Sequence, residues 1–416
     1  MSDQPNRTFR ALSGGLAGRT FRAFTYRDFR LLWGGAFTSA TGTWMQIVAQ
    51  AWVVLDLSGS VFYLGLVGFL GQLPILLFTL LGGVLADRVD RRKLLLFSQY
   101  LQMVVAVVLT VLVYLNWIEV WHFLVLVFVS GSGQAFGGPA YQALIPSLVK
   151  KEDVPNAVAL NSIQFNLARV VGPVMAGAAL ASLGAVFCFG LNAISFLSVI
   201  VALYMIRTTF VPARTKDSVL LQIKGGFSYI WSKGDLWQLT VLGFASTFCG
   251  VPLLTLLPVY ARDVFGMGAT GYSYMMAISG AGSIFGALLY ATFSRISRQG
   301  ILTLWVQVCF GILLCLFALS RSLPLSCLLL FATGLCLISL FASITSLAQL
   351  TTDDAMRGRM MSIFMLAFRG GMPLGDLMAG WLASQFSPTF ALVVLGTLLI
   401  VIAVGFLISP SGVKRL

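Results

Sequence analysis

The chain has 416 residues, of which 58% are hydrophobic and 10% charged, and its formal net charge is +13. A water-soluble domain carries about 45–50% apolar and about 25% charged residues, and a soluble core cannot bury such an apolar excess. The composition therefore excludes a soluble enzyme, a disordered protein and a disulfide-stapled secreted domain. It leaves a helical membrane protein, because the apolar residues come in long runs rather than in the alternation typical of an outer-membrane barrel.

The chain begins with a basic segment and continues with apolar segments long enough to cross a membrane. Residues 1–29 carry several arginines but no apolar stretch, so we expect no cleavable signal peptide. A membrane-spanning helix needs about 20 mostly apolar residues. Twelve such segments follow, at 30–55, 60–86, 94–115, 121–144, 157–182, 186–206, 235–261, 271–293, 300–320, 324–350, 359–384 and 388–409.

The longest polar interval between these segments, 207–234, separates the first six from the last six. The sequence therefore predicts an all-α polytopic membrane protein of twelve transmembrane helices in two pseudo-symmetric six-helix bundles. Its parts are a cytoplasmic N-terminal segment (1–29), an N-terminal bundle (30–206), a cytoplasmic linker (207–234), a C-terminal bundle (235–409) and a cytoplasmic tail (410–416).

The basic residues predict the orientation in the membrane. If the N-terminus is inside, 23 of the 27 Lys and Arg residues lie on the cytoplasmic side. Only Arg262 and Arg321 lie on the outer side, and Arg169 and Arg369 lie within spans. Lys and Arg concentrate in cytoplasmic loops, so we expect both chain ends in the cytoplasm.

Two similar stretches indicate that the halves are repeats. Glu152-Asp153 precedes Arg169 and then GPVMAG (172–177), and Asp353-Asp354 precedes Arg369 and then PLGDLMAG (373–380). The spacing is 16 residues from Asp153 to Arg169 and 15 from Asp354 to Arg369. The segments 157–182 and 359–384 are therefore expected to be pseudo-symmetric partners, as in two-halved secondary transporters.

The loop after the second segment reads GGVLADRVDRRKLLL (82–96). It resembles the signature of the major facilitator superfamily, G-x-x-x-D-R/K-x-G-R/K-R/K, through Gly83, Asp87, Arg88, Arg91 and Arg92; Asp90 stands where the family usually has Gly. The resemblance covers essentially the whole chain after residue 20 and implies the twelve-helix transporter fold.

This loop is also the predicted gate on the cytoplasmic side. A carboxylate is stabilised by guanidinium groups and by a helix N-terminus, so Asp87 can latch the halves together by facing Arg357 or Arg359. The alternative for the basic residues, which we favour for Arg91, Arg92 and Lys93, is a positively charged cluster that only fixes topology.

The fifth segment contains ARVVGPVMAGAAL (168–180), which resembles a shortened form of the Gly-Pro motif of proton antiporters in this superfamily. Pro173 removes a helical hydrogen bond, and Gly172 and Gly177 allow close helix contact. These three residues are candidates for gating through a proton-tight seal, or they serve packing alone. In addition, 19–60 and 138–162 resemble the bacterial exporter branch that includes the enterobactin exporter, which implies efflux of a siderophore or similar amphiphile.

Charged residues inside a bilayer are costly and are functional candidates by default. Asp376 is the only acid deep within a predicted span, and it lies seven residues, or two helical turns, beyond Arg369. We therefore predict that Asp376 carries the coupling proton, with Arg369 and Arg169 as its partners. The alternative is a structural ion pair between Asp376 and one of the two arginines.

Uncharged polar residues in the first, fourth and fifth segments are the candidates for substrate binding. Amides and phenols in a mostly apolar cavity suit an amphiphile with many hydrogen-bonding groups, although each could instead bond a neighbouring helix. These residues are Gln46, Gln50, Gln134, Tyr141, Asn161 and Gln164.

The sequence lacks a GxxxxGK[ST] motif, and its longest polar stretch between spans has only about 28 residues, so we expect no ATP hydrolysis and no enzyme activity. Six cysteines without CxxC spacing predict neither a metal site nor disulfides. We expect no cofactor, because the proton gradient would supply the energy.

We therefore expect a monomeric secondary exporter in the bacterial inner membrane, working by proton antiport and alternating access on a siderophore-like or drug-like molecule. Its expected partners are this small molecule, the lipid bilayer, and export proteins of the periplasm or outer membrane, but not nucleic acid. Two alternatives remain: a proton symporter that imports a nutrient, and a non-transporting membrane sensor or assembly partner.

Overall fold

The computed structural model describes residues 21–208, 227–293, 298–353, 356–409 and 412–416, apart from the side chains of 80, 84, 86–88 and 293. All secondary structure within these ranges is helical, and each of the twelve predicted segments forms a helix. The first six are α3 (Arg27–Ser58), α4 (Val61–Arg88), α5 (Arg91–Tyr114), α6 (Val120–Leu144), α7 (Val154–Ser182) and α8 (Gly184–Met205). The rest are α10 (Gly234–Gly250) with α11 (Pro252–Val259), α12 (Ala269–Phe293), α13 (Gln299–Leu319), α14 (Leu323–Leu350), α15 (Arg357–Gln385) and α16 (Pro388–Ile408).

Ten of these helical stretches in the described ranges are long and apolar enough to cross a membrane, α10 and α11 counting as one. The two that are too polar for this criterion, α3 and α15, contain several of the predicted site residues. A helix with polar groups on one face is stable in a bundle when that face is turned away from lipid. The polarity of α3 and α15 therefore indicates a position inside the assembly.

The seventh segment is not the continuous helix that the sequence predicts over 235–261. It is interrupted at Val251, because Pro252 has no N–H with which to continue the hydrogen-bond ladder. After α11 the chain closes with a π-helical turn, Tyr260–Val264. Helices interrupted in this way free backbone groups and are common where transporters bind ligands.

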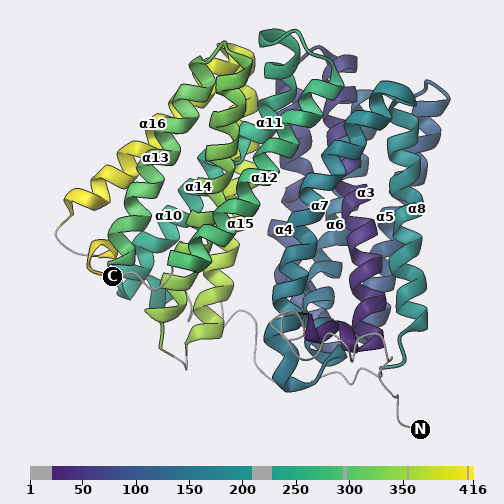
Figure 1. The fold of residues 1–416 in the computed structure, drawn as a ribbon, viewed down its shortest axis with the longest axis horizontal. Coiled ribbons are helices and arrows are strands. Elements are labelled where there is room, and N and C mark those ends of the chain that lie inside the picture. Colours follow the sequence, from purple (N-terminus) through teal and green to yellow (C-terminus); the bar gives the residue numbers. More distant parts are fainter. Residues whose placement is uncertain (1–20, 209–226, 294–297, 354–355, 410–411) are drawn as a thin grey trace.

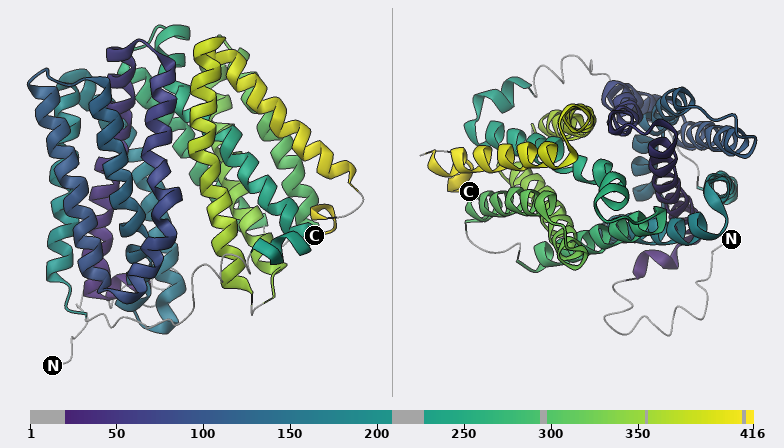
Figure 2. Two further views of the ribbon diagram at one scale, coloured as in Figure 1. Left: turned by 180° about the vertical axis from the view of Figure 1, so that it is seen from behind. Right: turned by 90° about the horizontal axis from the view of Figure 1, so that it is seen from above.

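The helices form two bundles, α3–α8 and α10–α16, which stand side by side in Figures 1 and 2. The bundles meet chiefly where α4 packs on α15 and where α7 packs on α12. Helices α4 and α12 are the second of their bundles, and α7 and α15 are the fifth. The two contacts are therefore related by exchange of the halves, as expected of pseudo-symmetric repeats.

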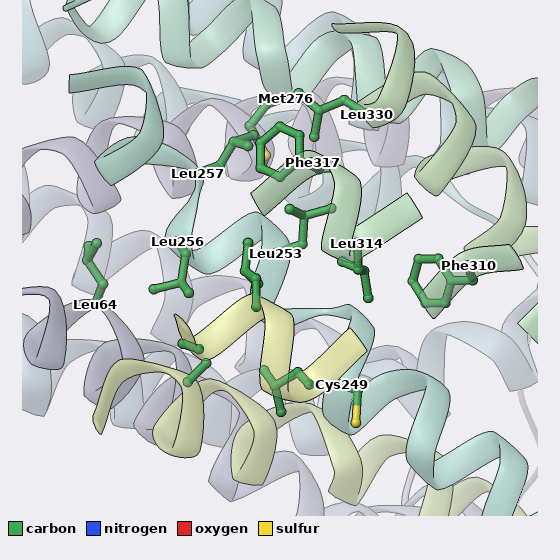
Figure 3. Packing of buried hydrophobic residues seen from close by; sticks show 14 of the residues in the cluster. Leu64, Cys249, Leu253, Leu256, Leu257, Met276, Phe310, Leu314, Phe317 and Leu330 are labelled. Carbon is green, nitrogen blue, oxygen red and sulfur yellow. The ribbon is translucent and has the colours of Figure 1, made fainter. Parts of the chain in front are cut away.

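The bundles touch at one end and diverge at the other. We call the end with the start of α3 and the loop between α4 and α5 the predicted cytoplasmic face, and the opposite end the predicted outer face. The ribbons separate toward the predicted cytoplasmic face (Figure 1). One continuous hydrophobic core joins the halves toward the outer face, where Leu64 of α4 lies beside Leu256 of α11 (Figure 3).

At the predicted cytoplasmic face the N-terminal half has a hydrophobic core of its own. It includes Phe29, Leu95, Leu144, Leu160 and Leu203, and every buried member comes from the N-terminal half. The core of the N-terminal half at this face is therefore separate from the core that joins the two halves, which agrees with bundles that are closed at the predicted outer face and parted at the predicted cytoplasmic face.

Candidate functional site

Asp376 lies in the contact between the halves. Its side chain is buried, with the residue 4% exposed, and its Oδ1 accepts a 2.6 Å hydrogen bond from the hydroxyl of Thr255 on α11. On the other side lies α4: a methyl group at Gly68 would stand 2.7 Å from Asp376 Oδ2, and one at Gly65 would stand 2.8 Å from the Cα of Gly380. Two glycines of one half therefore make room for the carboxyl group of the other.

Asp376 and Arg369 do not form the predicted pair. In the described residues, neither Arg369 nor Arg169 forms an ion pair, and Thr255 is the hydrogen-bond partner of the Asp376 carboxyl group. Arg369 shares the helix face of Asp376, but its side chain is exposed whereas Asp376 is buried. The structural ion pair is therefore absent here.

Arg369 points away from lipid. The exposed apolar residues in this part of α15 are Leu374, Met378 and Trp381, which lie on the opposite side of the helix at 100° per residue. The neighbouring Gly370 faces Leu76 of α4. The exposed guanidinium of Arg369 therefore lies on the side of α15 that faces the other half.

Arg169 has a corresponding place on α7. It is half-buried, and its guanidinium carbon lies 5.6 Å from the centre of the Trp44 ring of α3, which is cation–π range. Its carbonyl oxygen is 3.1 Å from the position that a Cβ on Gly280 of α12 would take. Arg169 thus lies where the two halves begin to touch.

The two arginines are equivalent in the repeat. Each is followed four residues later by a proline, Pro173 and Pro373. This register aligns Asp376 with Ala176, which is fully buried in α7. Asp376 therefore has no acidic counterpart in the N-terminal half, whereas Arg369 has Arg169 as its counterpart.

Three of the six predicted substrate-binding residues are hydrogen-bonded within the N-terminal half. Gln46 Oε1 accepts a 2.7 Å hydrogen bond from Asn192, and the Tyr141 hydroxyl donates to Asn161 Oδ1 at 2.7 Å. Gln164 is buried, and Gln50 is half-buried.

Gln134 is the exposed member of this set. It lies on the side of α6 opposite the exposed Trp121 and Val125. Its amide is therefore directed away from lipid, and its role as a substrate contact stays a prediction.

The loop after α4 is tied to its own half. Asp90, at the position where the superfamily usually has Gly, caps α5 by accepting a 2.9 Å hydrogen bond from the Arg92 amide. Arg91 donates to the Ala143 carbonyl at the end of α6, and Arg92 donates to the Tyr204 carbonyl at the end of α8. Cations favour helix C-termini, so these arginines also stabilise the N-terminal bundle.

The predicted latch between Asp87 and Arg357 or Arg359 stays a prediction. The side chains of Asp87 and Arg88 lie outside the described residues. Gly83 has no neighbouring atom within 4 Å of the position that a Cβ would take. Arg357 and Arg359, at the start of α15, are exposed at the predicted cytoplasmic face.

The Gly-Pro motif serves two different contacts. At Gly172 an added Cβ would stand 2.7 Å from the Thr41 carbonyl, which is packing within the N-terminal half. At Gly177 it would stand 2.8 Å from Ser273 Cβ on α12, which is contact between the halves. Pro173 is buried between them in α7.

Two residues at the site were not anticipated from the sequence. Thr255 lies 121 positions from Asp376, and Trp44 packs on Arg169 from another helix. Thr255 carries a recognisable signal, a lone hydroxyl between Pro252 and Pro258 in an apolar run. Trp44 carries none, because tryptophans are common in membrane helices.

The two pseudo-symmetric bundles, closed at one face around an acid from one half, define a transporter of the major facilitator type. Residues 19–411 match the family model described as "Transmembrane secretion effector", and the chain belongs to this family. The resemblance to the superfamily is thereby confirmed.

Relatives of the chain are transporters of several small molecules. It is 28% identical over 359 residues to the multidrug efflux pump Tap of Mycolicibacterium fortuitum, which covers 84% of this chain and 87% of the relative. It is 26% identical to the staphyloferrin A transporter of Staphylococcus aureus (91% and 96% covered) and 25% identical to the enterobactin exporter EntS of Shigella boydii (91% and 92%).

Solved structures share the fold. A D-xylose–proton symporter superposes with a TM-score of 0.73 at 15% identity, covering 94% of this chain and 99% of that one. A bacterial homologue of the lysosomal transporter Spinster, solved inward-facing and occupied, has a TM-score of 0.73 at 13% identity, with 94% and 99% covered.

Proposed function

We propose that the protein exports an amphiphilic small molecule, siderophore-like or drug-like, across the bacterial inner membrane in exchange for protons. Its family consists of secretion effectors, and the relatives Tap and EntS are named for efflux and export. The shared family and the match over most of both chains support the same direction of transport for this chain. Both chain ends would lie in the cytoplasm, as the distribution of basic residues predicts.

The observation that carries the proposal is the burial of Asp376 in the contact that closes the predicted outer face. A carboxylate without a cationic partner is expensive to bury, whereas a carboxyl group that keeps its proton packs at much lower cost. Contact between α4 and α15 therefore favours the protonated side chain, and loss of the proton favours separation of the two helices.

This dependence gives the order of events for antiport. A proton taken up from outside allows the outer face to close over Asp376 and the cytoplasmic face to part. Release of the proton inward and binding of substrate then favour the outward-open arrangement, from which the substrate leaves. Each ligand shifts the balance by its different affinity for the two arrangements.

The test is uptake into everted inner-membrane vesicles that contain the full-length protein and are energised by respiration. The probes are a catecholate siderophore, a carboxylate siderophore and a cationic drug, and the matched control acid is the exposed Asp56 at the outer end of α3. We expect uptake of at least one probe to fall about tenfold or more in Asp376→Asn and to persist in Asp56→Asn. Equal uptake by wild type and Asp376→Asn would overturn the coupling role.

A further inference from the structure

Arg169 and Arg369 have no carboxylate partner in the described part of the chain, although both lie midway along helices that cross the membrane. A guanidinium stays charged under all ordinary conditions. At this depth a charged side chain faces the interior of the bundle or a water-filled cavity and takes a polar partner there. Trp44 lies against the Arg169 guanidinium, but in the described residues neither arginine donates a hydrogen bond to a protein oxygen, so water or an anion from outside the protein is left to supply that partner.

The two arginines lie on facing surfaces of the two halves. Arg369 is exposed on the side of α15 that faces α4, and Arg169 lies on α7 beside Gly280 of α12. Their equivalent places in the repeat put one cation on each side of the pseudo-symmetry axis. A ligand between the halves would meet both charges.

Aromatic rings accompany both arginines. Trp44, under Arg169, makes an edge contact with Phe165 of α7, with ring centres 6.3 Å apart, and Phe165 is exposed on the same helix face as Arg169. On the other side, half-buried Phe341 of α14 packs at 4.5 Å on the buried ring of Phe368, which precedes Arg369 in the chain. Rings bury apolar ligand surface, while guanidinium groups bind carboxylates and similar anions in a fixed geometry.

We infer that the exported substrates are amphiphilic anions, held by Arg169 from one half and Arg369 from the other. This inference rests on the proposed export function and narrows its substrate class. It also assigns the arginines to the substrate rather than to Asp376. Organic cations of the same size would be disfavoured, because two uncompensated positive charges repel them.

The experiment measures equilibrium binding to the full-length protein in nanodiscs of uncharged lipid, by fluorescence anisotropy without a proton gradient. The probes are fluorescein, which is a dianion at mildly alkaline pH, and rhodamine 123, a cation with the same ring system. We expect tighter binding of fluorescein, weakened about tenfold by Arg169→Gln and by Arg369→Gln. Rhodamine binding should be unchanged or tighter in these variants.

Two further variants separate loss of binding from loss of fold. Arg169→Lys and Arg369→Lys keep the charge and should retain part of the affinity for fluorescein. Arg321→Gln removes a cation at the predicted outer face and should bind fluorescein as wild type does. Fluorescein binding no tighter than rhodamine binding, or fluorescein binding unchanged in both Gln variants, overturns the inference.

The outcome is independent of proton coupling. If both Gln variants weaken fluorescein binding while vesicle uptake is unchanged in Asp376→Asn, the antiport proposal fails and the anion site is supported. If uptake is lost in Asp376→Asn but fluorescein binding is unchanged in both Gln variants, the anion site fails and the antiport proposal is supported.

Discussion

Asp353 is the structural counterpart of Asp153. Each accepts a 2.7 Å hydrogen bond from a tyrosine near the start of its own half, Tyr26 for Asp153 and Tyr229 for Asp353. Each also lies 3.1 Å from a basic group, Arg22 Nε and Lys233 Nζ respectively. The sequence spacing aligns Asp153 with Asp354. The contacts in the structure align Asp153 with Asp353 instead, which shifts this part of the repeat alignment by one residue.

This register agrees with the rest of the repeat. Asp153 precedes Arg169 by 16 residues, and Asp353 precedes Arg369 by the same 16. In both halves the hydrogen bond joins the segment just before the first helix (α3 or α10) to the segment just before the fifth helix (α7 or α15). The fifth helix of each half packs on the other half. The two tyrosine–aspartate contacts therefore position α7 and α15, two of the helices through which the halves meet.

The two contacts should differ in their contribution to stability. The Asp153 side chain is 4% exposed and that of Asp353 is 66% exposed. Asp153→Ala leaves the Tyr26 hydroxyl without its acceptor, which should cost about 1–3 kcal/mol, whereas Asp353→Ala should cost clearly less because solvent replaces the lost contact. Thermal unfolding in detergent, with exposed Glu152→Ala as control, measures the difference. Equal losses in the two Asp variants would contradict it.

The Tyr229–Asp353–Lys233 contact should hold across the neutral range. The Tyr229 hydroxyl and then the Lys233 ammonium lower the pKa of Asp353, and Tyr229 and then Asp353 raise the pKa of Lys233. The stability from Asp353 is therefore complete above its ordinary pKa of about 4 and is lost as the pH falls through its lowered value. That from Lys233 is complete below about pH 10 and is lost above its raised value.

The measurement is the difference in melting temperature between wild type and Asp353→Asn as a function of pH. We predict a constant difference from about pH 5 to about pH 9, shrinking below about pH 4. A difference that changes in the middle of that range would show that another titrating group controls the contact.

Gly65→Ala should open the predicted outer face. The added methyl group would collide with the Asp376 carbonyl and stand 2.8 Å from the Cα of Gly380, so α4 and α15 would have to separate. Overpacking of this kind costs about 1–3 kcal/mol, enough to shift a two-state balance roughly tenfold. Gly34→Ala is the matched control, because no atom lies within 4 Å of that added methyl group.

The readout is the distance between spin labels at Leu57 and Phe386, which are exposed at the outer ends of α3 and α15. All six native cysteines are free and would first be replaced. Gly65→Ala should populate a longer distance, and Gly34→Ala should match the parent protein. An unchanged distance in Gly65→Ala would mean that this contact does not hold the outer face closed.

Much of the fold was predictable because hydropathy alone marks a membrane span. The predicted bounds of most segments lie within a few residues of the helices, as for 388–409 against Pro388–Ile408. The interruption of the seventh helix at Pro252 was not predicted. Hydropathy measures only how apolar a segment is, so it does not register that one backbone N–H is missing.

The site was only partly predictable, because it depends on contacts between distant segments. The shared face of Arg369 and Asp376 followed from helical spacing, yet their different burial depends on where α4 crosses α15. The hydrogen bond between Gln46 and Asn192 joins residues 146 positions apart, and no local sequence pattern predicts it. Asp90 shows the converse case: it departs from a motif, and its helix-capping role explains why the departure is tolerated.

The measurement that tests the account most directly is proton movement in proteoliposomes that contain the purified protein and an internal pH dye. A substrate gradient would be imposed without an initial pH difference, and wild type would be compared with Asp376→Asn and Asp56→Asn. We predict that substrate moving out of the vesicles drives protons in, in wild type and Asp56→Asn, and that Asp376→Asn abolishes this proton flux. Protons moving in the same direction as the substrate, or a flux that persists in Asp376→Asn, would contradict antiport through Asp376.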